Sequence, residues 1–432
     1  MDPTFRATRG AGGTYVPPPD KSITHRALML AAIADSPSRV GRPLATGDCV
    51  STRRCLESLG VRVMDMDGGV EVRGVGLRGF GEPMRTLDAE NSGTTTRLLS
   101  GLLAGQKLFA VLSGDESLVR RPMARVVQPL REMGARIEGR DAGKFAPLCF
   151  LPGNGDLRPL SWELPVPSAQ VKSSLLLAAL RASAPSTISG KTGSRDHTER
   201  MLRSLGVRID ASGLRLDVHP AGRLPGFEVD VPGDVSSAAF FVAASLISGK
   251  PLVVRGCGIN PTRLGFIEAA RRMGASAVIA EEGVSLGEPF GTVTVTPGRL
   301  RGTVVGPDEV PELIDEIPLL AVLGLFASGV TRVSGASELR VKESDRLEMI
   351  ARMVRGLGGR IETTEDGFVV EGPQKLGSSA AVDPGGDHRI AMAAAVAGAG
   401  IPGGVRVSGF DCSRVSYPDF IRDFTALGGE VA

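Results

Sequence analysis

Four helix starts in this 432-residue chain carry side chains suited to binding anions. They are Lys21-Ser22-Ile-Thr-His25-Arg26, Asn91-Ser92-Gly93-Thr94, Ser168-Ala169-Gln170-Val171-Lys172-Ser173 and Asp387-His388-Arg389. Any one of them could be ordinary N-capping, because Ser, Asp and Asn are favoured there. Capping alone does not explain four such starts in register, three of them with cations. Since a helix N-terminus offers free N–H groups and a partial positive charge, these segments predict phosphate or carboxylate sites.

Loops before other helices hold a second set of charged residues. They are Gly114 to Pro122 with Arg120 and Arg121, Gly190 to His197 with Ser194 and Arg195, and Glu338 to Arg346 with Arg340, Lys342, Glu343 and Asp345. For Arg120, Arg340 and Asp345 a solvated helix start is an equally good interpretation. On helix geometry Lys342 and Arg346 should share one face, one turn apart.

Together these segments predict a cleft that gathers seven cations. They are Lys21, Arg26, Arg121, Arg195, Lys342, Arg346 and Arg389. Because their mutual repulsion must be offset, the expected ligand carries at least two anionic groups, such as a phosphate on each of two substrates. Acid–base chemistry also needs a carboxylate within reach of the moving proton. Asp315, Glu316 and Glu343 are the candidates, with N-capping as the alternative for Asp315.

The elements that position these residues are copies of one repeat. Six amphipathic helices end in Leu-Gly or Met-Gly at intervals of about 70 residues, at Gly60, Gly134, Gly206, Gly274, Gly358 and Gly428. Six further helices, rich in Ala, Leu and Val, start near Asp20, Asn91, Ser168, Asp234, Asp315 and Asp387. A fixed period of this kind indicates one supersecondary motif copied along the chain.

The first repeat shows the expected order of elements. A buried helix at 22–34 precedes a strand at 38–40 and an amphipathic helix at 50–59, and Gly60 ends the latter. A hairpin follows, with strands at 61–66 and 70–73 around Asp67-Gly68-Gly69. Pro17-Pro18-Pro19 and the Pro/Gly-rich segment 219–226 then leave three repeats on each side. The chain is therefore expected to be two similar α+β domains with a ligand cleft between them.

Bulk composition excludes several classes of protein. A net charge of +2 and only 4% aromatic residues argue against nucleic-acid binding, and no apolar run is long enough to cross a membrane. The five cysteines have no metal-binding spacing, and we expect no signal sequence, because Met1 to Arg6 lack an apolar signal segment. We expect a cytoplasmic protein without a metal or cofactor, and a monomer.

At these residues the chain resembles the 5-enolpyruvylshikimate-3-phosphate synthase family, the 3-phosphoshikimate 1-carboxyvinyltransferases. The resemblance covers the whole chain. The motifs that carry it, in order, are Asp20 to Arg26, Asn91 to Thr94, Arg121-Pro122, Ser168-Ala169-Gln170, Leu313 to Glu316, Arg340 to Arg346 and Asp387-His388-Arg389. One such motif would be weak, whereas seven in order within the repeats are specific.

The resemblance implies both a reaction and an architecture. Phosphoenolpyruvate would donate its enolpyruvyl group to the 5-hydroxyl of shikimate 3-phosphate and release phosphate, a step of the shikimate pathway to aromatic amino acids. The fold would be two inside-out domains of three βαβαββ repeats each. One domain spans 16–225 and the other 226–432 together with the N-terminal strand in 1–15, with hinges near 14–19 and 219–228. No cofactor is implied.

Residue roles follow from the same resemblance. Shikimate 3-phosphate would be held by Lys21, Ser22, Arg26, Ser168, Ala169, Gln170, Ser194, Arg195, Asp315, Glu338 and Lys342. Phosphoenolpyruvate would be held by Lys21, Asn91, Gly93, Arg121, Gln170, Arg346 and Arg389. Asp315 would take the 5-hydroxyl proton, and Glu343 with Lys21 would handle the proton at the methylene carbon.

Two departures from the family pattern bear on ligands. Val415 stands where the family often has a Lys, beside Arg414 as a possible substitute. Ser168-Ala169-Gln170 and Arg195 resemble herbicide-tolerant variants, whereas Gly93 resembles the small residue of glyphosate-sensitive enzymes. We expect glyphosate to inhibit this chain, because position 93 carries no methyl group to crowd it.

Two alternatives remain at the level of sequence. The related enolpyruvyl transferase that acts on UDP-N-acetylglucosamine has a reactive Cys in the loop where this chain has Asp115 to Arg121, and that loop has none. A non-catalytic repeat protein that binds phosphorylated ligands would bind both substrates and release no phosphate.

Overall fold

The computed structural model describes residues 2–7 and 10–432, which form two compact units. The first unit comprises Pro232–Gly283, Pro289–Ala432 and the described part of Met1–Pro18. The second unit comprises Pro19–Val231 and Val284–Glu288. The chain therefore passes from one unit to the other four times.

Three four-stranded sheets belong to the second unit. Their strand orders are β14 (Glu228–Asp230), β3 (Ser38–Gly41), β5 (Gly69–Arg73), β4 (Arg62–Met66); β6 (Leu87–Asp88), β7 (Ala110–Ser113), β9 (Phe145–Phe150), β8 (Ile137–Gly139); and β10 (Ser161–Leu164), β11 (Ser186–Gly190), β13 (Arg215–Val218), β12 (Ile209–Ser212). In each sheet the first two strands are parallel and the other pairs antiparallel. One sheet pattern thus recurs three times within this unit.

The first unit holds three sheets of similar design. Their strand orders are β2 (Gly13–Tyr15), β15 (Leu252–Gly258), β17 (Glu288–Thr296), β16 (Ser276–Ser285); β18 (Val304–Val305), β19 (Gly329–Val333), β21 (Phe368–Gly372), β20 (Glu362–Thr363); and β22 (Ala380–Val382), β23 (Val405–Val407), β1 (Thr4–Arg6), β24 (Glu430–Val431). Each again begins with a parallel pair. The predicted α+β class, with two similar halves of three βαβαββ repeats, is confirmed.

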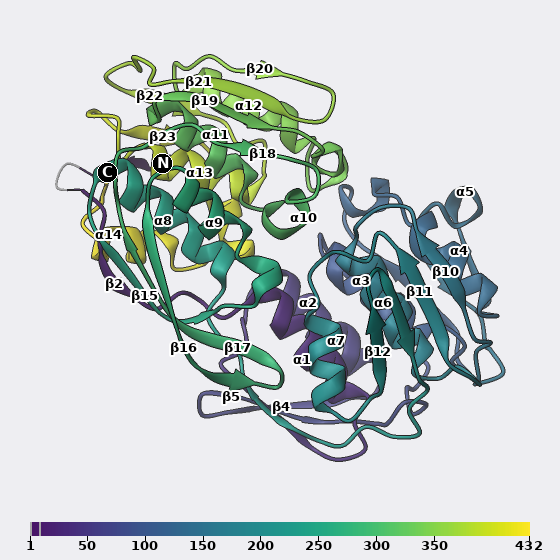
Figure 1. The fold of residues 1–432 in the computed structure, drawn as a ribbon. Coiled ribbons are helices and arrows are strands. Elements are labelled where there is room, and N and C mark those ends of the chain that lie inside the picture. The colour runs from purple at the N-terminus through teal and green to yellow at the C-terminus, as the bar shows by residue number, and fades with distance from the viewer. Residues whose placement is uncertain (1, 8–9) are drawn as a thin grey trace. The chain divides into compact units, whose positions relative to one another are not determined.

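Three buried helices form the core of each unit. They are α1 (Lys21–Ala32), α3 (Gly93–Leu103) and α6 (Ala169–Ala179) in the second unit, and α8 (Val235–Ser248), α11 (Ile317–Phe326) and α13 (His388–Ala397) in the first. In the first unit these helices contact one another, with the strands around them (Figure 1). In α11 every residue from Ile317 to Leu325 is buried, as expected for a helix that is apolar on all sides. Helices at the centre and sheets outside give each unit its inside-out character.

Amphipathic helices complete each repeat. They are α2 (Gly47–Ser58), α4 (Ala124–Glu132), α7 (His197–Ser204), α9 (Gly265–Arg272), α12 (Arg346–Gly356) and α14 (Phe420–Ala426). The remaining short elements are α5 (Arg140–Gly143) and α10 (Val310–Leu313), with the 3-10 turns η1 (Leu118–Arg120), η2 (Pro261–Arg263), η3 (Ser337–Val341) and η4 (Phe410–Val415). The glycine that follows each amphipathic helix has a φ between +82° and +107°, a backbone conformation that favours glycine, so the six predicted glycine stops are confirmed.

Strands β1, β2 and β14 each pair with a strand from a distant part of the chain. β2 precedes α1 along the chain but pairs with β15 in the first unit, where Thr14 lies opposite Val253. β14 precedes α8 but pairs with β3 in the second unit, where Val229 lies opposite Val40. The first unit therefore builds two of its sheets with strands from the N-terminal segment.

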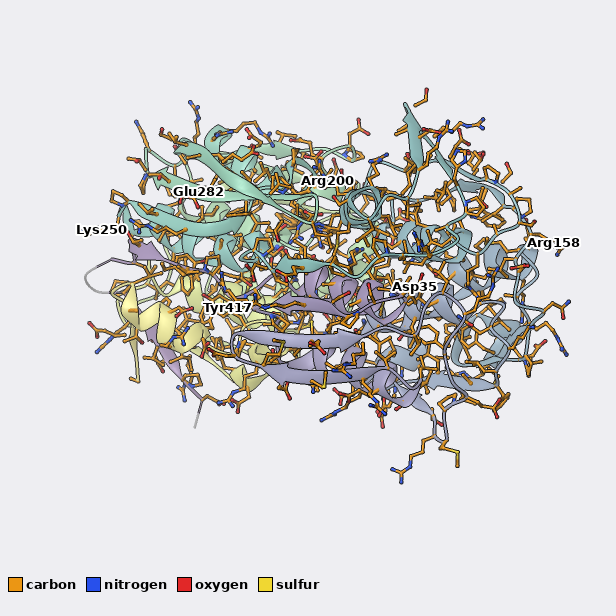
Figure 2. The ribbon with its side chains drawn as sticks, turned by 90° about the horizontal axis from the view of Figure 1, so that it is seen from below. Asp35, Arg158, Arg200, Lys250, Glu282 and Tyr417 are labelled. Atoms are coloured by element: carbon orange, nitrogen blue, oxygen red, sulfur yellow. The ribbon has the colours of Figure 1, made fainter. Side chains whose placement is uncertain are left out.

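An aromatic cluster fixes the chain ends inside the first unit. Phe5 of β1 contacts Phe424 of α14 edge-on at 5.5 Å, and Phe241 of α8 stacks on Phe420 at 5.2 Å. The hydroxyl of Tyr417, labelled in Figure 2, donates a hydrogen bond to Asp423 Oδ2 at 2.7 Å. Because these rings bury large apolar areas, the N-terminal strand is held firmly to the C-terminal helix.

Candidate functional site

Arg26 joins three helices of the second unit. Arg26 of α1 is 4% exposed and donates through Nε to Thr198 Oγ1 of α7 and through Nη2 to Ser173 Oγ of α6, both at 2.8 Å. Its Nη1 also donates to the carbonyl oxygen of Ser22 at 2.9 Å. Burial lowers the pKa of Arg26 to about 10, although nearby carboxylates including Glu199 act the other way. The guanidinium remains charged at neutral pH and ties three helices together.

Lys21 lies at the first position of α1 and is held by a carboxylate. Its Nζ donates to Asp48 Oδ2 at 2.9 Å, and Asp48 belongs to α2. Asp20 caps the helix by accepting from the Ile23 N–H at 2.8 Å. The ion pair holds the Lys21 ammonium in place. Because Lys21 and Asp48 keep 14% and 11% of their side chains exposed, a ligand can still reach it.

His25 lies buried behind this ion pair. Its Nδ1 lies 2.7 Å from Thr52 Oγ1, and burial lowers the pKa of the imidazole to about 3, with Lys21 and Arg26 adding to that effect. The ring is therefore neutral at physiological pH and adds no positive charge to the site.

A second group of residues surrounds Gly93 at the start of α3. Arg121 donates through Nη2 to Asn91 Oδ1, and Arg97 donates through Nη1 to Gln170 Oε1 at 2.7 Å. Both guanidinium groups are more than nine-tenths buried. A Cβ at position 93 would lie 2.6 Å from Arg97 Nη1 and 3.2 Å from Arg121 Nη1. Glycine is thus the residue that lets both cations approach the helix N-terminus.

The start of α6 and the loop before α7 make a third group. Ser168 caps α6, with its Oγ accepting from the Val171 N–H at 3.4 Å, and Ala169 and Gln170 form the first turn. Ser194 is buried and Arg195 half-buried on the 191–196 loop. Apart from the residues around Gly93, seven predicted site residues belong to this unit. They lie on three segments, α1, the start of α6 and the 191–196 loop: Lys21, Ser22, Arg26, Ser168, Ala169, Ser194 and Arg195.

In the first unit the predicted cations lie among carboxylates. Arg346 opens α12 and has no exposed surface. It donates through Nε to Asp387 Oδ2 at 2.9 Å and through Nη2 to Glu343 Oε2 at 2.5 Å. Burial alone would lower the pKa of Arg346, but these carboxylates and Asp315 outweigh it and raise the pKa above its usual value. In turn Arg346 overcomes the effect of burial on Asp387 and lowers the pKa of that carboxyl.

Asp315 connects this cluster to α13. One carboxylate oxygen lies 3.4 Å from Arg389 Nη2 and the other lies 3.6 Å from Arg346 Nη1. The N-cap position of α11 is occupied by Glu316, so Asp315 does not serve as the cap. Asp315 keeps 13% of its side chain exposed, and its role as a proton acceptor stays a prediction.

The predicted helical pairing of Lys342 with Arg346 is wrong. Lys342 has extended backbone angles at the end of η3, and α12 begins only at Arg346. The reason is Asp345, which accepts a hydrogen bond from the Glu348 N–H at 3.2 Å and so caps the helix one residue before Arg346. Lys342 and Glu338 are both half-buried on this turn.

Carboxylates accompany the cations of both units. In the second unit Lys21 pairs with Asp48 and Lys172 with Glu199, whereas in the first unit Asp315, Glu343 and Asp387 surround Arg346 and Arg389. That these cations need an anionic ligand stays a prediction. Across residues 2–7 and 10–432, no group of three His, Cys, Asp or Glu side chains could hold a metal ion.

Comparisons with known proteins agree with this arrangement. The sequence profile of the EPSP synthase (3-phosphoshikimate 1-carboxyvinyltransferase) family matches residues 9–424. The chain belongs to the EPSP synthase family. It is 47% identical over 427 residues to the 3-phosphoshikimate 1-carboxyvinyltransferase of Pelotomaculum thermopropionicum, covering 97% of both chains, and 41% identical over 424 residues to that of Bacillus cytotoxicus, covering 98% of this chain and 99% of the relative. A solved structure of EPSP synthase from Acinetobacter baumannii covers both chains fully, with a TM-score of 0.87 and 36% identity.

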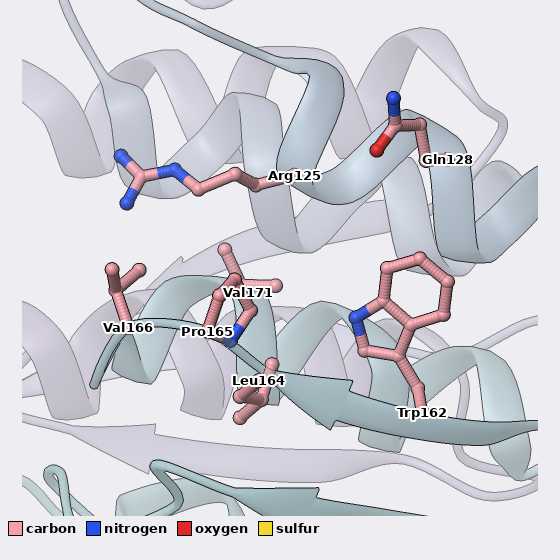
Figure 3. A pocket seen from close by; sticks show the side chains of 7 residues that line it. All are labelled: Arg125, Gln128, Trp162, Leu164, Pro165, Val166 and Val171. Atoms are coloured by element: carbon pink, nitrogen blue, oxygen red, sulfur yellow. The ribbon is translucent and has the colours of Figure 1, made fainter.

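One hollow lies beside the start of α6 in this EPSP synthase family member. Arg125, Gln128 and Trp162 line it together with Leu164, Pro165, Val166 and Val171 (Figure 3). At about 60 Å³ it is far smaller than the roughly 300–1,000 Å³ of a ligand pocket, and none of the predicted site residues lines it. We therefore do not assign it to a substrate.

Several polar residues of the site were not predicted from the sequence. Arg97 lies one turn after Gly93, so its helical spacing from a predicted residue could have indicated it. Lys172, one turn after Ser168, was included in a predicted helix start but was given no role. Asp48 and Glu199 are partners from other segments, and no local pattern marks them. Arg414, considered as a substitute at the position of the family's missing Lys, is exposed and lies 3.4 Å from Asp411.

No helix among the described residues is both long and apolar enough to span a membrane.

Proposed function

We propose that this chain is a 3-phosphoshikimate 1-carboxyvinyltransferase, which transfers the enolpyruvyl group of phosphoenolpyruvate to the 5-hydroxyl of shikimate 3-phosphate and releases phosphate. The observation that carries this proposal is the full-length family match of a chain whose second unit gathers buried cations at three helix starts. Both substrates carry a phosphate and a carboxylate, which are the groups that such a site binds.

Shikimate 3-phosphate would be bound mainly by the second unit. Arg26 and Ser22 of α1, Ser168, Ala169 and Gln170 of α6, and Ser194 and Arg195 of the 191–196 loop offer charged and neutral hydrogen-bond donors. Lys21 would add a further cation, and Asp315, Glu338 and Lys342 would complete the set from the first unit. The hydrogen bonds that join Arg26 to α6 and α7 support this assignment, because they fix the guanidinium in advance of binding.

Phosphoenolpyruvate would be bound by the group around Gly93 and by the cations of the first unit. Arg121 is hydrogen-bonded to Asn91, and Arg97 to Gln170 and the Gly93 carbonyl. Lys21 would add a cation, whereas Arg346 and Arg389 are the candidates in the first unit. Paired guanidinium forks suit a carboxylate and a phosphate on one small molecule.

The reaction proceeds by addition and then elimination. Asp315 accepts the proton of the 5-hydroxyl as its oxygen bonds to the central carbon of phosphoenolpyruvate, while Glu343 with Lys21 supplies a proton to the methylene carbon. The resulting tetrahedral adduct loses phosphate from the central carbon and a proton from the new methyl group, which restores the double bond. Holding both substrates by fixed cations makes this step effectively intramolecular. No metal or cofactor takes part.

Further aspects of the assignment follow the family. We infer a cytoplasmic monomer that binds these small molecules and not nucleic acid, with glyphosate as an inhibitor. We also infer that its domains are 16–225 and 226–432 with 1–15, hinged near 14–19 and 219–228. The two compact units support these domain bounds, because their main boundaries follow Pro18 and Val231, close to the inferred boundaries after residues 15 and 225.

The test is phosphate release by the purified protein from phosphoenolpyruvate, with and without shikimate 3-phosphate. Release only with both substrates, lost in Lys21→Ala, supports the assignment. Release with UDP-N-acetylglucosamine in place of shikimate 3-phosphate would move the chain to the related transferase. Binding of both substrates without release from either pair would indicate a non-catalytic binding protein.

A further inference from the structure

Lys172 is a buried cation with no role in the assignment above. It lies on α6 one turn after Ser168, and its backbone N–H donates to the Ser168 carbonyl at 3.0 Å. Only 2% of its surface is exposed. A lysine at such a depth must have partners for its ammonium group, because an unpaired buried charge is strongly unfavourable.

The ammonium group of Lys172 is fully satisfied by one short segment and one helix. Nζ donates to the carbonyl oxygens of Thr192 and Ser194, each at 3.0 Å, and lies 2.7 Å from Glu199 Oε1 of α7. An ammonium group has three donors, so these three acceptors use all of them. Two of the three are main-chain groups of the 191–196 loop.

Other bonds of the loop lie within it or lead to β10 and α7: Asp196 pairs with Arg200 at 2.8 Å, and the N–H of Thr192 donates to the Gly190 carbonyl at 2.7 Å. The N–H of Ser194 donates to the Thr192 carbonyl at 2.8 Å, and the N–H of Lys191 donates to the Leu164 carbonyl at 3.0 Å. Gly193, between the two carbonyls that Lys172 binds, has no atom within 4 Å of where a Cβ would lie. The Lys172 ammonium is therefore a principal link between this loop and α6.

We propose that Lys172 is a positioning residue for shikimate 3-phosphate. Its ammonium holds Ser194 and Arg195 at a fixed place beside Ser168 and Gln170, so that loop and helix present one preformed surface. Glu199, the partner of Lys172, follows Thr198, which accepts a hydrogen bond from Arg26 Nε at 2.8 Å, so the first turn of α7 contacts both cations. This inference rests on the proposed function, which assigns Ser194 and Arg195 to that substrate.

The test compares Lys172→Met with a matched variant, Arg181→Met. Arg181 is also a buried cation of the second unit, but it donates to the Leu102 and Ala104 carbonyls at the end of α3, away from the loop. Lys172→Met should raise the Kd of shikimate 3-phosphate, measured by calorimetry, by roughly 10- to 100-fold, because misplaced binding groups lose affinity steeply. The KM of phosphoenolpyruvate at saturating shikimate 3-phosphate should change less than threefold. Arg181→Met should lower the unfolding temperature and leave that Kd unchanged.

A second measurement follows the loop itself. Amide hydrogen exchange in residues 191–196 should quicken in Lys172→Met and not in Arg181→Met. Should Lys172→Met fail to fold, the double variant Lys172→Met with Glu199→Gln removes both buried charges and is measured in its place. A Kd for shikimate 3-phosphate within twofold of wild type in a folded Lys172 variant would overturn the proposal, as would unchanged exchange in the loop. If instead the wild type neither binds nor turns over shikimate 3-phosphate, the proposed function has failed, and the exchange measurement still decides whether Lys172 positions the loop.

Discussion

Replacing Gly93 by Ala would test how closely the two guanidinium groups approach the start of α3. The new methyl carbon would lie 2.6 Å from Arg97 Nη1, which must retreat by about 0.8 Å to reach an ordinary contact of 3.4 Å. That movement would break its 2.7 Å hydrogen bond to Gln170 Oε1. A hydrogen bond from a charged group contributes roughly 1.5–3 kcal/mol, so we expect the KM of phosphoenolpyruvate to rise about 10- to 100-fold.

The assay is phosphate release at saturating shikimate 3-phosphate over a range of phosphoenolpyruvate concentrations. The unfolding temperature should fall only slightly, because the preference of alanine over glycine in a helix, about 0.5–1 kcal/mol, offsets part of the lost hydrogen bond. Gly222→Ala is the matched control, since a Cβ at Gly222 meets no atom within 4 Å. A KM of phosphoenolpyruvate within twofold of wild type in Gly93→Ala would refute the reasoning.

The same variant bears on the inhibitor. We expect glyphosate to inhibit the wild type in competition with phosphoenolpyruvate and to inhibit Gly93→Ala much less, because the methyl group crowds the same cations. Full activity of the wild type in millimolar glyphosate would contradict this expectation.

Two further predictions concern buried charges. Because the folded-state pKa of His25, about 3, lies below the usual 6.5, the unfolded chain binds that proton more readily below pH 6.5, and stability is lost as pH falls from 6.5 toward 3. The free energy of unfolding, measured with urea, should be about 2 kcal/mol lower at pH 5 than at pH 7 because of His25. The same difference should remain in the control His219→Gln, whose histidine is partly exposed, and this contribution should be missing in His25→Gln. Arg346→Met should lower the free energy of unfolding by about 3–5 kcal/mol, because Asp387 is then buried beside other carboxylates without a cation. Adding Asp387→Asn should recover part of that loss in thermal unfolding, and no recovery would show that the ion pairs are not its cause.

Much of the fold could be predicted because its signals are local. Each amphipathic helix ends at a glycine that must adopt a positive φ, so Gly60 and its five counterparts mark the repeats directly. Helix starts are equally local, because Asp20, Ser168, Asp234 and Asp387 accept hydrogen bonds from N–H groups two or three residues onward. The predicted helix at 22–34 is α1 at Lys21–Ala32.

The partners of the charged residues could not be predicted in this way. Lys21 pairs with Asp48, and Lys172 with Glu199, across 27 residues in each case, and nothing in the intervening sequence indicates the pairing. The cations of the first unit were expected to need a ligand for charge balance, yet Asp387, predicted only as a helix start, is a fully buried counter-ion of Arg346. Such pairings depend on tertiary packing, which a repeat pattern does not specify.

The N-terminal strands β1 and β2 affect how the chain folds during synthesis. The first unit needs β1 and β2 from the N-terminus to pair with β15, β23 and β24, so its sheets cannot be complete until Val431 has left the ribosome. The second unit needs only residues up to Glu288. We therefore expect the second unit to fold first while residues 2–7 and 10–15 wait for partners more than two hundred residues away, a high contact order that slows folding. A gene cut between Val231 and Pro232 would accordingly separate β2 from β15 and leave the C-terminal fragment without the strands that close two of its sheets.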